Sequence, residues 1–162
     1  MTSSRKAMVD TCIWVLSKKK PSPQRFKSRD EYKRALMVHR RAQAFFKNTF
    51  PKLKVYMSLH QVAEIFHVMA FRGAKVPLEE ALKVVNEILV NPSVMKIPVS
   101  ERHVKKSIEL SAETGIHVWD FLCFIPVKDF VEVIYTGDRH FLRIGEMFRV
   151  DVVNPLKYWL KA

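Results

Sequence analysis

The feature that most constrains the fold is a regular alternation of short apolar stretches with longer segments that have helical periodicity. Five stretches have the length and apolar content of buried strands, at residues 6–9, 54–58, 94–99, 131–135 and 148–153. The segments between most of them carry helix start and stop signals. Strands that alternate with helices predict an α/β protein, a three-layer α/β/α fold around a central, mostly parallel five-stranded sheet.

Capping residues predict where the helices begin and end. The start signals, in chain order, are Ser28 with Glu31, Ser58 with Gln61, Pro77, Ser100 and Asp120. The stop signals are Asn48, Gly73, Asn91 with Pro92, Gly115 and Pro126. Residues 11–16 are expected to form a short helix or a loop, and no helix is predicted between the last two strands.

Length and composition favour one soluble domain. A chain of 162 residues, 48% of them hydrophobic, can bury a substantial core. The longest stretch free of charged residues, 55–63, has nine residues, whereas a membrane-spanning helix needs roughly 20. The first residues lack the apolar core of a signal peptide. Cys12 and Cys123 lie among apolar residues and are interpreted as buried free thiols in a reducing compartment, so a cytoplasmic location is expected.

Nearly all of the excess positive charge lies in one segment. Residues 18–54 contain 13 lysines and arginines but two acids, a net charge of +11 out of +12 for the whole chain. A localised basic block is typical of proteins that bind a nucleic-acid backbone, although a solvated helix face has the same composition. The candidate backbone contacts are Arg25, Lys27, Arg40, Arg41 and Lys47.

Four acids lie inside or at the end of apolar stretches: Asp10, Glu64, Asp120 and Asp138. An acid among buried residues needs hydrogen bonds, a cation or a metal ion to offset desolvation. Asp10 and Asp138 both follow predicted strands, and ligands of parallel sheets gather beyond the carboxyl ends of the strands. Taken singly, Asp10 and Asp138 could each be a turn residue and Asp120 could be a helix N-cap.

Glu64 belongs to a polar stripe on an otherwise apolar helix. His60, Glu64 and His67 fall at positions i, i+4 and i+7, so they share one face, which meets either water or a site. Coordination of zinc or iron by histidine and carboxylate is the sharper alternative, but the stripe is not a His-Glu-x-x-His motif. The chain has no Gly-rich phosphate loop, no Cys-x-x-Cys pair and no Gly-x-Ser-x-Gly elbow.

The order and spacing of the four acids resemble those of the PIN-domain nucleases, especially the VapC-like ribonuclease toxins. The shared pattern runs over residues 6–154: a strand ending in Asp10-Thr11, then Ser58 with Glu64 six residues later, then Gly115 with Asp120, then a strand ending in Thr136-Gly-Asp138. The resemblance implies a PIN-like fold in which the four acids bind Mg²⁺ or Mn²⁺ and act in RNA cleavage, with the hydroxyls of Thr11 and Thr136 in support. It also implies RNA, an antitoxin protein and a second copy of the chain as partners.

Two departures from that family bear on the prediction. The first two acids are separated by 53 residues, more than in compact members, and the excess is the basic segment. It is therefore interpreted as a loop–helix insertion at about 18–54 in a single PIN-like domain that spans 1–162. His140 stands two residues after Asp138, where many members carry another acid. The leading hypothesis is a metal-dependent endoribonuclease of a toxin–antitoxin pair, and the alternative is a non-catalytic RNA-binding module in ribosome assembly or RNA processing.

Overall fold

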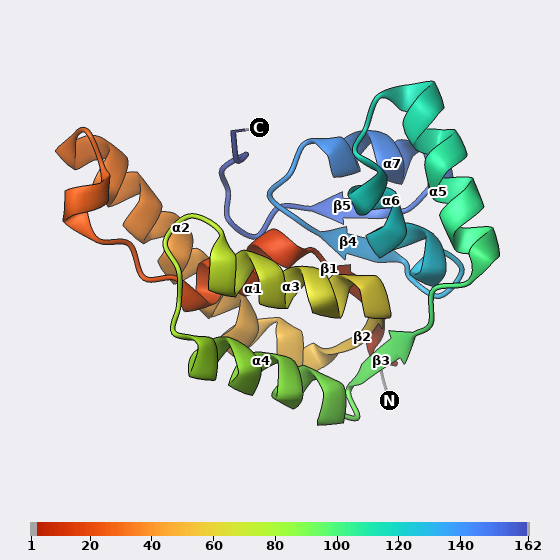
Figure 1. The fold of residues 1–162 in the computed structure, drawn as a ribbon, viewed down its shortest axis with the longest axis horizontal. Helices are drawn as coiled ribbons and strands as arrows, with labels where there is room; N and C mark the ends of the chain where they lie inside the picture. Colours follow the sequence, from red (N-terminus) through yellow and green to blue (C-terminus); the bar gives the residue numbers. More distant parts are fainter. Residues whose placement is uncertain (1–2, 162) are drawn as a thin grey trace.

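A parallel sheet of five strands forms the centre of the protein, in a computed structural model that describes residues 3–161 (Figure 1). The strand order is β3-β2-β1-β4-β5, and every neighbouring pair is parallel. The strands are β1 (Arg5–Val9), β2 (Leu53–Ser58), β3 (Val94–Ile97), β4 (Val133–Tyr135) and β5 (Asp151–Val153). Together with the helices on its two faces, this sheet confirms the predicted three-layer α/β/α fold.

Seven α-helices connect or flank the strands of the described chain. They are α1 (Thr11–Lys18), α2 (Arg29–Asn48), α3 (Leu59–Phe71), α4 (Leu78–Val90), α5 (Glu101–Thr114), α6 (Val118–Phe124) and α7 (His140–Phe148). The predicted caps of α2, α3 and α5 form, because the hydroxyls of Ser28, Ser58 and Ser100 each accept a hydrogen bond from the backbone N–H three residues later. Gly115 ends α5 with a left-handed backbone.

Side chains of each central strand point alternately to two separate cores. In β1, Ala7 and Val9 belong to a core shared with α1, α2, α3 and α4, whereas Met8 belongs to a second core shared with α5, α6 and α7. Figure 1 shows these two groups of helices on opposite sides of the sheet. Both faces are therefore covered, which explains why the strand segments are almost continuously apolar.

The last part of the chain differs from the prediction. Residues 140–148, for which no helix was predicted, form α7. The helical apolar pattern here is short: Phe141 and Ile144, three positions apart, are both fully buried. The helix ends at Arg149, whose φ of 56° is left-handed, so β5 begins at Asp151 and not at 148. A Cβ on Gly145 would lie 2.4 Å from Val152 Cγ2, so α7 packs against β5 too closely for any side chain at this position.

The basic segment forms mainly α2 and the loop before it. The residues of α2 that are buried begin only at Val38 and continue with His39, Ala42 and Phe45. The first turns of the helix, with the preceding loop, project beyond the helices that cover the sheet (Figure 1). Across residues 3–161, none of the helices combines the length and the apolar character needed to cross a bilayer.

Candidate active site

The site lies beside β1, where the order in which the strands are added to the sheet reverses. β1 is flanked by β2 on one side and β4 on the other, and the ends of β1 and β4 are in register, with Val9 opposite Tyr135. The backbone N–H of Asp10 donates to the carbonyl of Tyr135 at 2.9 Å. Asp10 and Thr136 therefore leave two neighbouring strands at the same edge of the sheet. Such a reversal of strand order opens a crevice at the carboxyl ends of the strands.

Asp10 is the most enclosed of the four predicted acids, with 6% of its surface exposed. One carboxylate oxygen accepts the backbone N–H of Thr11 at 2.8 Å and so caps α1. The other accepts the hydroxyl of Thr136 at 2.7 Å and the thiol of Cys12 at 3.3 Å. Asp10 thus caps a helix after the strand, a local role like the turn role considered for it, and also belongs to the acid cluster.

Two threonines connect the acids. Thr11 Oγ1 donates to Glu64 Oε2 at 2.6 Å, and this joins the first turn of α1 to the middle of α3. Thr136 Oγ1 donates to Asp10 and accepts the backbone N–H of Asp138 at 2.9 Å. The backbone N–H of Thr11 donates to Asp10 and completes the connection, so hydrogen bonds run from Glu64 through Thr11, Asp10 and Thr136 to the turn that carries Asp138. These bonds fix the relative positions of the elements.

Asp120 and Asp138 meet at His140. The His140 ring nitrogen Nδ1 lies 3.2 Å from Asp120 Oδ2 and 3.6 Å from Asp138 Oδ1. The expected N-cap role of Asp120 is wrong, because His117 occupies that position and Asp120 lies inside the first turn of α6. This turn aims its carboxylate at the turn after β4, and its side chain is only 18% exposed.

Desolvation and mutual repulsion perturb two of these carboxyl groups. Burial is the main reason why the pKa of Asp10 rises from 3.8 to about 7; the Thr136 hydrogen bond opposes the rise, and the charges of Asp120 and Glu64 add to it. Burial also raises the pKa of Asp120 to about 6, with Asp138 as the next cause. Within residues 3–161, none of the four acids pairs with a lysine or arginine. The cluster thus lacks a permanent cation to balance it.

The three residues of the predicted polar stripe on α3 lie in different environments. Glu64 points into the acid cluster, while His67 is exposed beside Phe71, with 5.6 Å between the ring centroids. His60 is half-buried and stacks on Trp119 of α6 at 5.6 Å. One helix face therefore meets both a site and solvent, the two outcomes that the sequence left open.

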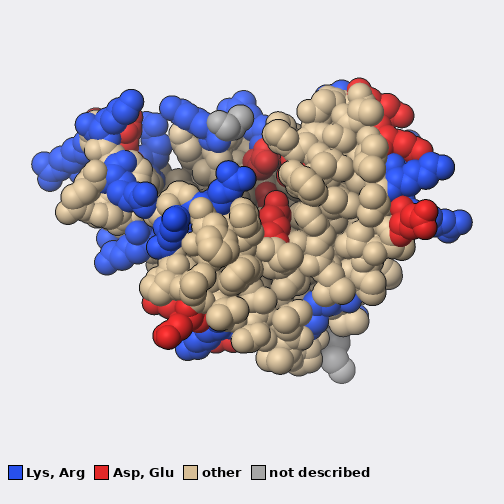
Figure 2. Space-filling view, in the orientation of Figure 1, with Lys and Arg blue, Asp and Glu red and all other residues tan. Residues whose placement is uncertain are grey.

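The predicted backbone contacts separate into two kinds. Arg25, Lys27, Arg40 and Lys47 are exposed, whereas Arg41 is half-buried and donates from Nη1 to the carbonyl of Leu156 at 2.8 Å. In Figure 2 a group of red acids lies in a hollow near the centre of the face, and blue side chains crowd the end that α2 forms and flank the hollow. The exposed basic residues thus belong to a surface beside the acids, and Arg41 serves to anchor α2.

The two cysteines are neighbours of the acids, a position that the sequence interpretation did not assign to them. Both are free thiols, as predicted; Cys12 is half-buried and Cys123 is buried. Cys123 Sγ donates to Glu64 Oε2 at 3.1 Å. The available signal was spacing, because Cys123 follows Asp120 by three positions and so shares its helix face.

Comparison with known proteins supports the fold alone. No family model matches the chain, and no curated protein matches its sequence. Among solved structures, the chain is similar to the Mycobacterium tuberculosis toxin VapC20, described as a sarcin–ricin loop cleaving toxin. The TM-score is 0.62 at 17% sequence identity, and the match covers 86% of this chain and 95% of the toxin. The chain therefore shares a VapC-like, PIN-type fold.

Proposed function

We propose that this protein is a divalent-metal-dependent endoribonuclease, with Asp10, Glu64, Asp120 and Asp138 as its acidic site. The observation that carries the proposal is the convergence of these four side chains, two from helices and two from the connections that follow β1 and β4, at the reversal point of a parallel sheet. The likeness of the fold to that of a VapC toxin supports the same reaction class.

The donor set fits Mg²⁺ or Mn²⁺. Carboxylate oxygens are the ligands that these hard cations prefer. Burial raises the pKa of Asp10 and Asp120, and the neighbouring carboxylates add to the rise, so their charged forms are poorly stabilised in the metal-free protein. A divalent cation would offset that charge. Thr11 and Thr136 hold Glu64 and Asp10 in place by donating to them, so the ligand oxygens are pre-oriented.

The chain's own residues would bind and position the RNA. A bound divalent ion would supply an activated water and would stabilise the negative charge that develops on the phosphate. Asp10 is buried and Glu64 is half-buried, whereas Asp138 has a side chain that is 36% exposed, so we place the open side of the cluster at Asp138. The phosphodiester would therefore approach from the Asp138 side.

The exposed basic residues Arg25, Lys27, Arg40 and Lys47 would attract the RNA backbone towards the acids. Their positive charge offsets the repulsion that a polyanion meets at an acidic site, and it makes no distinction between sequences. We further propose that the protein is the toxin of a toxin–antitoxin pair, that it binds an antitoxin protein and that it forms a homodimer, on the strength of the VapC-like fold.

The test is a cleavage assay on purified protein with Mg²⁺ or Mn²⁺, using a single-stranded RNA and a hairpin that carries the sarcin–ricin loop. Wild-type protein should cut at least one of them, and chelation should stop the reaction. Asp10→Asn and Asp138→Asn should each abolish cleavage while circular dichroism shows an unchanged fold. Equal cleavage by wild type and both variants would refute the proposal.

A second function is RNA binding without cleavage, and one observation favours it. His140 occupies the place next to Asp138 and contacts both Asp120 and Asp138, so an imidazole takes up space and hydrogen-bonding capacity at the open side of the cluster. Tight RNA binding with no cleavage under any divalent metal would select this alternative.

A further inference from the structure

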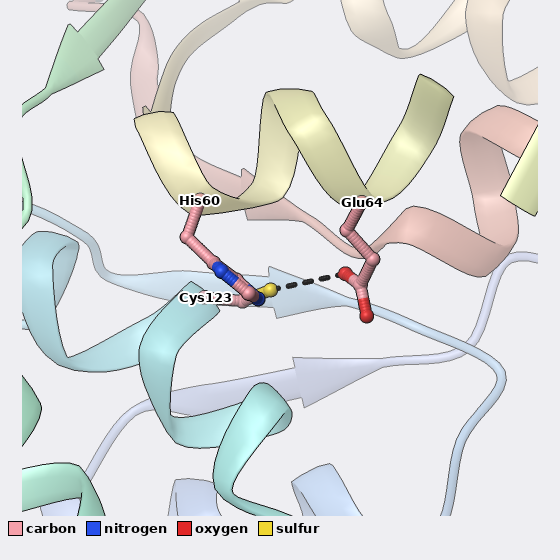
Figure 3. A group of neighbouring side chains, drawn as sticks. All are labelled: His60, Glu64 and Cys123. Carbon is pink, nitrogen blue, oxygen red and sulfur yellow. Dashed lines mark hydrogen bonds between the residues drawn. The ribbon is translucent and has the colours of Figure 1, made fainter. Parts of the chain in front are cut away.

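A second group of ligand atoms lies against the acid cluster and contains nitrogen and sulfur. His60 and Glu64 stand four positions apart on α3, and Cys123 lies on α6. One ligand atom from each of the three lies within 4.8 Å of the others. Figure 3 shows both α3 side chains directed towards the helix that carries the thiol.

One unpartnered atom shows that the group can accept a further ligand, and two contacts hold its side chains in place. His60 Nε2 is buried and has no hydrogen-bond partner among the described residues. A buried polar atom without a partner carries a desolvation cost that a ligand would remove. Trp119, stacked on the ring of His60 with an interplanar angle of 9°, holds the imidazole against α6. On the other side, Cys123 Sγ lies 3.1 Å from Glu64 Oε2, close enough for both atoms to share one ion.

We propose that His60, Glu64 and Cys123 form a Zn²⁺ site, which withdraws Glu64 from the acid cluster and so inhibits the nuclease. An imidazole, a carboxylate and a thiolate suit Zn²⁺, whereas Mg²⁺ prefers oxygen ligands. Three protein ligands leave a fourth position for water. On binding, the thiol proton that is now donated to Glu64 is released to solvent. The inhibition rests on the proposed ribonuclease function; the metal site does not.

Ligand separation fits such an ion after a small side-chain adjustment. Atoms bound to one Zn²⁺ at about 2.0–2.3 Å stand roughly 3–4 Å apart, and the three donor atoms lie within 4.8 Å. Cys12 offers a matched contrast, because its thiol also contacts a clustered acid, Asp10, yet its other polar contacts are the hydroxyl of Thr136 and the backbone N–H of Gly137, and not an imidazole. The site is thus specific to one of the two cysteines.

The experiment uses Co²⁺ as a spectroscopic substitute for Zn²⁺ on the chain of residues 1–162. Wild type should show a thiolate-to-cobalt charge-transfer band in the near ultraviolet, and added Zn²⁺ should remove it. Cys12→Ser should keep the band and Cys123→Ser should lose it. His60→Gln, at a half-buried position, should weaken Zn²⁺ binding at least about tenfold in competition with a chromophoric chelator, since even outer-shell partners contribute about that much.

Loss of the band in Cys12→Ser in place of Cys123→Ser, or its absence from wild type, would overturn the site. If Cys123→Ser does not fold, unchanged Zn²⁺ affinity of His60→Gln overturns it equally. In the cleavage assay, Zn²⁺ should inhibit wild type at lower concentrations than His60→Gln, each measured against its own Mn²⁺-supported rate. A Cys123-dependent band in a protein that cuts no RNA would leave the metal site standing and remove only the nuclease proposal.

Discussion

The acid cluster and the exposed basic residues of segment 18–54 are held in the structure in opposite ways. Asp10, Glu64 and Asp120 are each held by a partner far away in the sequence; Thr136, for example, contacts Asp10 across 126 positions. Asp138 lies in the same cluster but is held by His140, two positions away. The basic residues Arg25, Lys27, Arg40 and Lys47 stand exposed on one helix and the loop before it. A site that depends on topology should respond sharply to single changes, whereas a charged surface should respond gradually and to the sum of its charges.

The largest expected effect tests the sharp response of the acid cluster. Asp120→Asn should lower metal-dependent RNA cleavage by at least about 10³-fold, because loss of one carboxylate ligand removes several kcal/mol of transition-state stabilisation. Asp151→Asn is the matched control. It changes an exposed acid paired with Arg5 at the start of β5, at the opposite edge of the sheet, and should leave the rate unchanged. Comparable losses in both variants would mean that overall charge, and not the cluster, supports cleavage.

RNA binding by the basic surface should depend on the total number of its charges. Replacing Arg25, Lys27, Arg40 and Lys47 together by Glu should weaken RNA binding about 100-fold at low salt and reduce the salt slope by up to about 3, since each phosphate contact on a single strand contributes about 0.7. The measurement is the dissociation constant against salt concentration. A control that reverses the same number of exposed charges elsewhere uses Lys83, Arg102, Lys105 and Lys106.

Equal slopes in the two quadruple variants would show that the position of the charge is irrelevant and that the segment has another role. Each single reversal within 18–54 should shift the slope by less than about 1. That gradual response is the counterpart of the abrupt loss expected at Asp120.

How far the sequence predicts these two regions follows from the range of the interactions involved. Asp10 and Asp138 were predictable as neighbours, because parallel strands bring their carboxyl ends to one edge. The N-cap role expected for Asp120 was wrong, since a helix start can move by a few residues without changing the local pattern. The helix α7 carries only a short apolar signal, and its packing depends on Gly145 meeting β5, a contact between elements.

The cysteines show the same limit. Their apolar neighbours predicted burial correctly for Cys123, but the contact with Glu64 joins residues 59 positions apart and follows only from the packing of α6 on α3. For segment 18–54, composition alone indicated an exposed basic surface. Composition could not separate Arg41, which the fold turns towards Leu156, from its exposed neighbour Arg40.

A smaller effect concerns the stability of the metal-free protein. The pKa of Asp10 is about 7 in the folded protein against 3.8 as the ordinary value, so between these values the folded state binds more protons than the unfolded state. The slope of the unfolding free energy against pH is then negative: the penalty is absent below about pH 4, grows as the pH rises and is complete above about pH 7. Metal-free protein should therefore lose stability from pH 5 to pH 8.

Asp10→Asn removes the titrating charge and should reverse that loss. At pH 8 in the presence of a chelator, the variant should be more stable than wild type by about 2 kcal/mol. This is less than the roughly 4 kcal/mol that corresponds to a pKa of about 7 against 3.8, because the amide replaces one hydrogen-bond acceptor. At pH 5 the difference should shrink. Denaturant unfolding at both pH values measures it, and a variant that is less stable than wild type at pH 8 would show that Asp10 is satisfied without a cation. No such gain is expected from a change in the basic surface.

The smallest effect separates anchoring from binding within α2. Arg41→Ala removes the hydrogen bond to the carbonyl of Leu156, whose side chain is fully buried, and should cost about 1 kcal/mol of unfolding free energy. Its effect on RNA affinity should stay below about threefold, with the salt slope unchanged, because the half-buried guanidinium is already engaged by the protein. Arg40→Ala, one position away and exposed, should do the reverse: a measurable loss of affinity and no change in stability. If both variants lowered RNA affinity equally, Arg41 would have to leave Leu156 on binding, and the carboxyl-terminal segment that it anchors would have to move with it.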